Sequence, residues 1–234
     1  DDCMPSVLGY TEQGNFTPET LPPSLLEWIE GYSQIIQAAQ AQGLGPRVQT
    51  RANDKENIAP LVSAHWSQGA PYNNLCPYMS NGSGRALTGC VATAAAQVIY
   101  YWRKELPDRS QYDTPTYGYG DAPVTESFPK GTPLRWELMQ DNYGGSTPED
   151  MNTAVATLMA ITGTSTWLTY GSSTSGQIHD LVNTFSGQFL MDSRCTYKSG
   201  ISQSEWENMI YDDLSKGWPI VYSGVHPTDR KSVV

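Results

Sequence analysis

The feature that most constrains this chain is an alanine-rich apolar run at residues 90–102, which directly follows a loop rich in Gly, Asn and Pro at residues 69–89. Glycine and proline punctuate the loop, and the apolar run is long enough for a helix. Small side chains let such a helix pack closely against its neighbours. The pattern therefore predicts a buried helix that begins at Cys90, immediately after Gly89.

A thiol at the first position of a helix can be reactive. It faces backbone N–H groups without helical partners and the positive end of the helix dipole, which together favour the thiolate form. Gly89 would let the chain turn sharply and would let a substrate backbone approach. An equally good interpretation from composition alone is that Cys90 is a buried structural cysteine.

The overall composition excludes several classes of partner. The 234 residues carry a net charge of −10 and no Lys/Arg-rich run, which argues against binding to nucleic acid or to an anionic membrane. No apolar stretch reaches the roughly 20 residues that span a bilayer. The four cysteines, Cys3, Cys76, Cys90 and Cys195, form no C-x-x-C pair, so we expect neither a metal site nor a cofactor. If one thiol is kept for chemistry, at least two should be free.

Periodicity and caps predict the domain organisation. An amphipathic helix should run from Leu25 to near Gly43, followed by an exposed connector, so residues 1–54 are interpreted as the tail of something larger and residues 55–234 as the main domain. Further helices are predicted at 147–161, at about 176–185 and from a capping box at Ser202 and Glu205 to Gly217, with a strand at 219–223.

Gln68 is the second candidate for chemistry. It lies 22 residues before Cys90 in a polar loop. Acyl transfer from a thiolate creates an oxyanion that needs two hydrogen-bond donors, and the Gln68 amide beside the backbone N–H of Cys90 could supply them. Taken alone, a glutamine in a polar loop is usually just solvated.

Two ordered blocks, Trp66-x-Gln-x-x-Pro-Tyr-Asn73 and Thr88-Gly-Cys-Val-Ala-Thr-Ala94, resemble the streptopain family of secreted bacterial cysteine proteases. The resemblance implies an α+β, papain-like core with its helical half largely present and its sheet half truncated, preceded by the C-terminal part of an inhibitory propeptide. It implies a secreted, extracellular endopeptidase that acts on protein and peptide substrates and is inhibited by its own propeptide.

The same resemblance implies individual roles. Cys90 would be the nucleophile and Gln68 an oxyanion-hole donor. A Gly/Ser-rich loop would line the non-primed substrate pocket through Ser173, Ser175 and Gly176, although an ordinary turn before a helix explains each of these residues equally well. Trp136 would be a core-packing residue.

The histidine base is harder to assign. His226 lies 136 residues after Cys90, inside the papain-like spacing. The family places this histidine in Gly-His-Ala before an apolar strand, whereas Pro227 and polar residues follow His226. We therefore expect residues 223–234 to form a mobile loop and the catalytic histidine to lie beyond Val234. His65, in a loop, and His179, in a predicted helix, are assigned no role.

Two alternatives remain open. An amidase or acyltransferase could use the same papain-like core. A non-catalytic protein could instead use its many Tyr and Trp side chains as a surface that binds sugar or protein, with Cys90 only structural.

Overall fold

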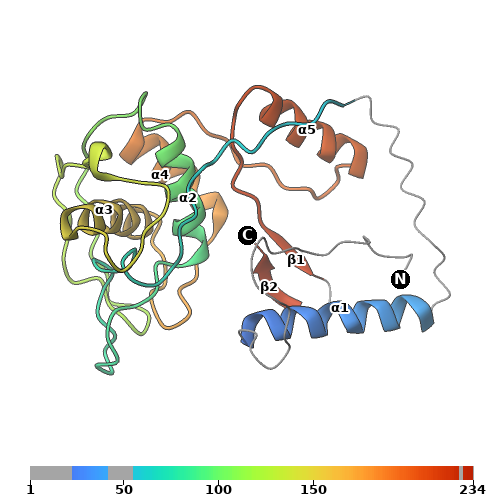
Figure 1. The fold of residues 1–234 in the computed structure, drawn as a ribbon, viewed down its shortest axis with the longest axis horizontal. Helices are drawn as coiled ribbons and strands as arrows, with labels where there is room; N and C mark the ends of the chain where they lie inside the picture. The colour runs from blue at the N-terminus through green and yellow to red at the C-terminus, as the bar shows by residue number, and fades with distance from the viewer. Residues whose placement is uncertain (1–22, 42–54, 227–228, 234) are drawn as a thin grey trace. The chain divides into compact units, whose positions relative to one another are not determined.

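The computed structural model describes residues 23–41, 55–226 and 229–233. The chain divides into two compact units, residues 1–56 and 57–234, and each is described by itself. The described part of the first unit consists mainly of helix α1 (Pro23–Ala41; Figure 1). The predicted helix from Leu25 is therefore confirmed, and it starts two residues earlier, with a proline in its first turn.

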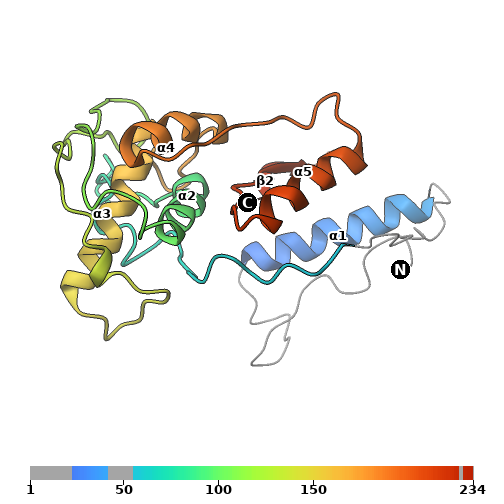
Figure 2. The same cartoon turned by 90° about the horizontal axis from the view of Figure 1, so that it is seen from above.

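The regular secondary structure of the second unit is mostly helical, and long irregular segments connect its helices, as Figures 1 and 2 show. Its α-helices are α2 (Cys90–Tyr101), α3 (Glu149–Ser165), α4 (Leu181–Phe189) and α5 (Gln203–Ser215), and two 3₁₀ turns, η2 (Trp136–Leu138) and η3 (Ile178–Asp180), lie between them. Its described strands are β1 (Gly224–His226) and β2 (Asp229–Val233).

The core forms where α2, α3 and α4 pack together. Every residue from Ala154 to Thr164 is buried, whereas Glu149, Asp150 and Thr153 near the start of α3 are exposed, so α3 is a central helix over its last three turns. The alanines Ala92, Ala95 and Ala96 on α2 are fully buried, and their small side chains allow the close approach to α3. The predicted close-packed alanine face of α2 is confirmed.

Irregular segments outside the helices are held by side-chain hydrogen bonds to the backbone. The indole of Trp136 donates to the Pro107 carbonyl at 3.1 Å, and its ring packs against the core, which confirms its predicted packing role. The hydroxyl of Tyr101, at the end of α2, donates to the Gly217 carbonyl at 2.9 Å, 116 positions along the chain. This bond joins α2 to the turn that follows α5.

One predicted helix lies at a different position, and one predicted strand does not form. The helix expected at 176–185 is instead η3 followed by α4, because Ser175 forms a bridge with Thr169 and Gln177 is still extended. Residues 219–223 do not form the predicted strand, because no backbone partner pairs with them among the described residues.

The expectation that residues 223–234 form a mobile loop is also wrong. Strands β1 and β2 pair antiparallel within it, with Gly224 opposite Val233 and His226 opposite Asp229. The capping box that begins α5 is confirmed, because the Ser202 hydroxyl accepts from the Glu205 amide while the Glu205 carboxylate accepts from the Ser202 amide.

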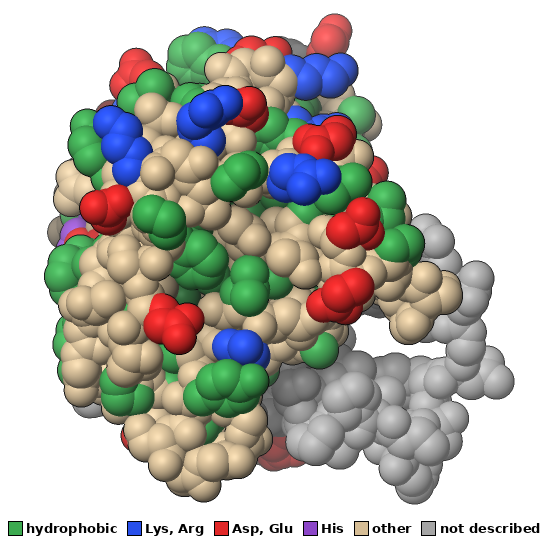
Figure 3. Space-filling model, turned by 90° about the vertical axis from the view of Figure 1, so that its left-hand side faces the viewer, with side chains coloured by type: hydrophobic (Ala, Val, Ile, Leu, Met, Phe, Trp, Pro, Cys, Tyr) green, Lys and Arg blue, Asp and Glu red, His purple; other side chains and the backbone are tan. Residues whose placement is uncertain are grey.

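The surface mixes side chains of all kinds. Figure 3 shows one face, on which hydrophobic side chains reach the surface between acidic, basic and polar ones. Within the described ranges, no helix combines the length and apolar character that a membrane span requires.

Candidate active site

Cys90 is the first residue of α2 and is half-buried. Gly89 precedes it with φ 84° and ψ 148°, an extended conformation with positive φ that is essentially restricted to glycine. Gly89 has no side chain to cap the helix, so the amides of its first turn have no side-chain acceptor at this end. The predicted position of Cys90 at a helix N-terminus is therefore confirmed.

A buried threonine pair braces the turn that presents Cys90. The Thr93 hydroxyl donates to the Gly89 carbonyl at 2.8 Å, and the Thr88 and Thr93 hydroxyl oxygens lie 2.8 Å apart. Because these atoms are shielded from water, the bonds hold the residues on both sides of Cys90 in one conformation.

The segment that carries Gln68 is tied to the same turn. The Thr88 amide donates to the Gln68 carbonyl at 3.1 Å, and the Trp66 amide donates to the Gln97 side-chain oxygen on α2 at 3.2 Å. The Trp66 ring packs against Tyr100 of α2, with centroids 4.9 Å apart. Two residues separated by 22 positions, Gln68 and Cys90, are thus brought to adjoining backbone segments.

The Gly/Ser-rich loop packs on this turn from another part of the chain. The Thr174 hydroxyl donates to the Leu87 carbonyl at 2.7 Å, and the Leu87 amide donates to the Gly171 carbonyl at 3.2 Å. Thr174 also closes against Gly89, where an added Cβ would lie 2.7 Å from Thr174 Cγ2. The site therefore combines three segments, 66–68, 87–93 and 171–174.

The three predicted pocket residues in this loop are all exposed. Ser173, Ser175 and Gly176 flank the buried Thr174, and the backbone of Ser175 pairs with Thr169. The structure therefore places them next to the segment that packs on the Cys90 turn. Their contact with a substrate remains a prediction.

The histidines are placed as follows. His65 is exposed in a loop, and the His179 side chain lies 3.3 Å from the Asp180 carboxylate in η3. Neither forms a hydrogen bond with Cys90 in the part of the chain that the structure describes. His226 belongs to β1, where only its backbone is described.

The three described cysteines are free and differ in environment. Cys90 is half-buried, Cys195 is exposed and Cys76 is fully buried. Burial raises the pKa of the Cys76 thiol to about 12. The expectation of at least two free thiols is confirmed. Across the described ranges, no cluster of His, Cys, Asp and Glu could hold a metal ion.

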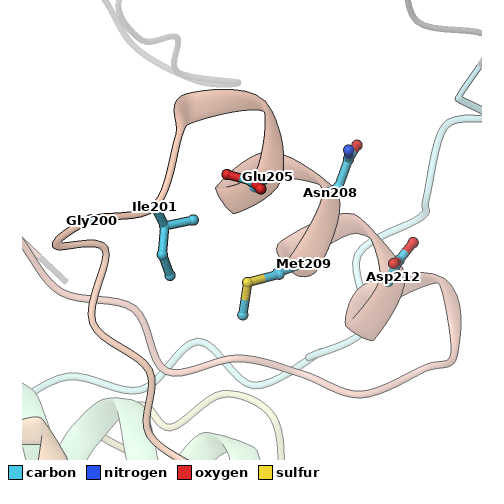
Figure 4. A pocket seen from close by; sticks show the side chains of 6 residues that line it. All are labelled: Gly200, Ile201, Glu205, Asn208, Met209 and Asp212. Atoms are coloured by element: carbon cyan, nitrogen blue, oxygen red, sulfur yellow. The ribbon is translucent and has the colours of Figure 1, made fainter.

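Two surface depressions lie away from Cys90. One, beside α5 in Figure 4, has a volume of about 430 Å³ and is lined by Gly200, Ile201, Glu205, Asn208, Met209 and Asp212. The other is lined by Tyr100, Arg103, Gln140, Asp141 and Asn142. Neither includes Cys90, Gln68 or the loop at 171–176.

Sequence reasoning missed Thr93 and Thr174 as parts of this site. Thr93 follows Gly89 by four residues, a spacing at which a helical threonine can bond back to a carbonyl, so a local signal existed. Thr174 contacts a carbonyl 87 positions away, and no local pattern predicts that pairing.

Sequence comparison identifies relatives over most of the chain. Residues 66–234 match the sequence model of the Peptidase C10 family. Over 96% of its length the chain is 28% identical to thiol protease/hemagglutinin PrtT of Porphyromonas gingivalis and 26% identical to streptopain of Streptococcus pyogenes. The chain spans 27% of the first relative and 61% of the second.

Two solved structures from Prevotella intermedia resemble the whole chain or its larger part. A prointerpain A fragment with a cysteine-to-alanine mutation matches 96% of this chain and 73% of its own, with a TM-score of 0.77 and 28% identity. Active wild-type interpain A cysteine protease matches 73% of this chain and 70% of its own, with a TM-score of 0.64 and 31% identity.

Proposed function

The chain belongs to the Peptidase C10 family, and on that premise we propose that it is part of a secreted cysteine endopeptidase that hydrolyses peptide bonds in proteins. The observation that carries the proposal is the position of Cys90 at the start of α2, after a glycine that leaves the first amides of the helix uncapped. This is the arrangement that favours a nucleophilic thiolate.

In the proposed reaction the Cys90 thiolate attacks the carbonyl carbon of the scissile peptide. The C=O π electrons move to oxygen, and the backbone N–H of Cys90 and the side-chain amide of Gln68 stabilise that oxyanion. When the tetrahedral intermediate collapses, an imidazolium donates a proton to the departing amine. Water then attacks the thioester and releases the carboxylic acid and Cys90. The bond between the Thr88 amide and the Gln68 carbonyl supports the pairing of these two residues.

The proposed base is an imidazole in a Gly-His segment, which the printed sequence does not contain. His226 is the alternative, because its spacing from Cys90 fits the papain-like pattern. Replacing His226 with Ala in the active protein separates the two assignments, since only loss of activity with intact folding supports His226.

Residues 1–54 are proposed to be the C-terminal part of an inhibitory propeptide. The prointerpain A fragment matches 96% of this chain, and the active interpain A matches 73%. The difference is about a quarter of the chain, which is the size of the first compact unit. Ser173, Ser175 and Gly176 are proposed to line the non-primed side of the substrate pocket, next to the Thr174 contact with the Cys90 turn.

Residue-resolved alkylation tests the nucleophile. With limiting iodoacetamide under native conditions, we expect Cys90 to react before Cys3, Cys76 and Cys195. Cleavage of unfolded casein by the full-length protein should be abolished by Cys90→Ala and retained by Cys195→Ala, a control at an exposed thiol. Equal labelling of all four thiols, or casein cleavage by Cys90→Ala, would contradict the proposal. Simple amides tested in parallel distinguish an amidase from a protease.

A further inference from the structure

Three aromatic rings form a stack outside the segments that hold Cys90. The Tyr117 ring lies 4.6 Å from that of Tyr119 at an interplanar angle of 17°, and 5.2 Å from that of Trp167 at 28°. Both neighbours are nearly parallel to Tyr117, so Tyr117 is the middle ring. The set of Tyr117, Tyr119 and Trp167 is called the aromatic stack below.

Hydrogen bonds fix the rings in place. The Tyr119 hydroxyl donates to the Trp167 carbonyl at 2.8 Å, and the Tyr117 hydroxyl donates to the Leu168 carbonyl at 3.0 Å. Gly120, at φ 82°, lets this loop approach residue 170, where an added Cβ would lie 2.8 Å from the Tyr170 carbonyl oxygen. These two bonds tie the stack to the backbone that follows α3, while the outer residues, Tyr119 and Trp167, stay partly exposed.

Trp167 adopts an unfavourable conformation while remaining exposed. Its φ of 56° lies in the left-handed region, which a bulky residue rarely occupies. Its exposed fraction is 53%, and that of Tyr119 is 42%. This left-handed residue belongs to the turn that ends α3, in which the Trp167 amide donates to the Thr164 carbonyl at 3.0 Å and the Leu168 amide donates to the Gly163 carbonyl at 3.2 Å. Glycine or asparagine would suit this turn better, so the tryptophan holds its ring against Tyr117 at a cost in backbone energy.

The electrostatic surroundings select the ligand. Burial and then the nearby Asp180 carboxylate raise the pKa of the Tyr119 hydroxyl, so a negative charge lies close to the stack. The faces of Trp and Tyr rings are themselves negative and attract Lys and Arg side chains. A carboxylate nearby adds a separate electrostatic attraction for the same cation. The net charge of −10 favours the same partner.

The aromatic stack is connected along the chain to the segment that packs on the Cys90 turn. Leu168 follows Trp167, and Thr169 pairs with Ser175 across the loop that contains Thr174. We propose that the aromatic stack is an accessory subsite that binds a Lys or Arg side chain of a polypeptide substrate, remote from the cleaved bond. Its role toward substrate rests on the proposed function, but cation binding by the stack does not.

Binding, measured without cleavage, tests this subsite. In the full chain carrying Cys90→Ala, we compare an acetylated, amidated Gly-Arg-Gly-Arg-Gly peptide with the same peptide containing citrulline, which is similar in shape to arginine and neutral. Titration calorimetry should give roughly two- to five-fold tighter binding for the arginine peptide, the range expected for an exposed cation–π contact. Trp167→Asn, which suits the left-handed backbone, should remove that difference.

A second tryptophan supplies the matched control. Trp218 is 46% exposed and lies beneath the Lys216 ammonium, so Trp218→Leu should leave the preference for arginine unchanged. Asp180→Asn should reduce the preference without unfolding the site. The proposal is overturned if the two peptides bind equally to the parent protein, if Trp167→Asn retains the preference, or if Trp218→Leu abolishes it. Because no cleavage is measured, these outcomes are separate from those that test Cys90 as nucleophile.

Discussion

Gly89 and Thr174 touch so closely that only a hydrogen fits between them, because an added Cβ on Gly89 would lie 2.7 Å from Thr174 Cγ2 and 3.1 Å from its Cβ. Gly89 also has φ 84°. Two separate physical reasons, backbone conformation and space, therefore require glycine immediately before Cys90.

Gly89→Ala should lower the free energy of unfolding by about 2–5 kcal/mol, combining about 1–3 for a backbone conformation essentially restricted to glycine with about 1–2 for the overlap. Urea unfolding measures the loss, and the rate of Cys90 alkylation should fall with it. Gly82→Ala is the control for a positive φ without crowding, because Gly82 has φ 77° and no atom within 4 Å of its added Cβ. Adding Thr174→Ser removes the overlapping methyl and should restore part of the stability. Equal losses at Gly82 and Gly89 would show that the contact with Thr174 costs nothing.

Thr93→Val should destabilise the protein by about 1–3 kcal/mol and slow alkylation of Cys90, because it removes the bond to Gly89 and leaves the buried Thr88 hydroxyl without its closest partner. Thr157→Val on α3 is a close match, since Thr157 is equally buried and also bonds to the carbonyl four residues earlier. That control should lose less stability and leave Cys90 alkylation unchanged. If both variants alkylate at the parent rate, the threonine pair does not position Cys90.

Leu190→Gly should raise the free energy of unfolding by about 0.5–1 kcal/mol. Leu190 ends α4 with φ 54° and is 61% exposed, so the substitution relieves a left-handed backbone and removes little packing. Thermal unfolding measures the gain. Leu190→Ala keeps the unfavourable backbone and should give no stabilisation, so an equal gain from both substitutions would assign the effect to the lost side chain instead.

The buried thiol of Cys76 should make the free energy of unfolding depend on pH. Burial raises the pKa of its thiol from 9.0 to about 12, so the folded state holds this proton more tightly than the unfolded state. The resulting stabilisation is complete below pH 9 and is lost as the pH rises toward 12, with an upper size of about 4 kcal/mol for a shift of about three units.

Cys76→Ala should therefore flatten the decline in stability between pH 9 and pH 12, measured by urea unfolding at several pH values. The comparison with the parent reports Cys76 together with its coupling to Tyr117 and Tyr170, because Cys76 contributes to the raised pKa values of both tyrosines. Parallel stability curves for the two proteins across this range would mean that folding does not raise the pKa of the Cys76 thiol.

The sequence predicted where helices start when the signal lies in a few neighbouring residues. The start of α2 at Cys90 follows from glycine beside an alanine-rich run, and the start of α5 follows from the capping box of Ser202 and Glu205. The adjoining positions of Gln68 and the Cys90 turn could be anticipated because two sequence blocks carried them together.

Features that depend on distant partners were not predictable in the same way. Residues 219–223 have a strand-like sequence, but a strand needs a neighbour to pair with, and the pairing begins only at Gly224. The contact of Thr174 with Gly89 joins positions far apart in the chain. The left-handed backbone of Trp167 runs against the preference of the residue itself, so sequence reasoning favours the wrong conformation there.

The hydrogen bond from Tyr101 to Gly217 has a consequence for biosynthesis. A ribosome adds roughly 5–20 residues per second, so α2 leaves the exit tunnel several seconds before its partner carbonyl is made, 116 residues later. During that interval the nascent helix lacks this tether, and the final alignment of its C-terminal end must wait until translation has passed α5.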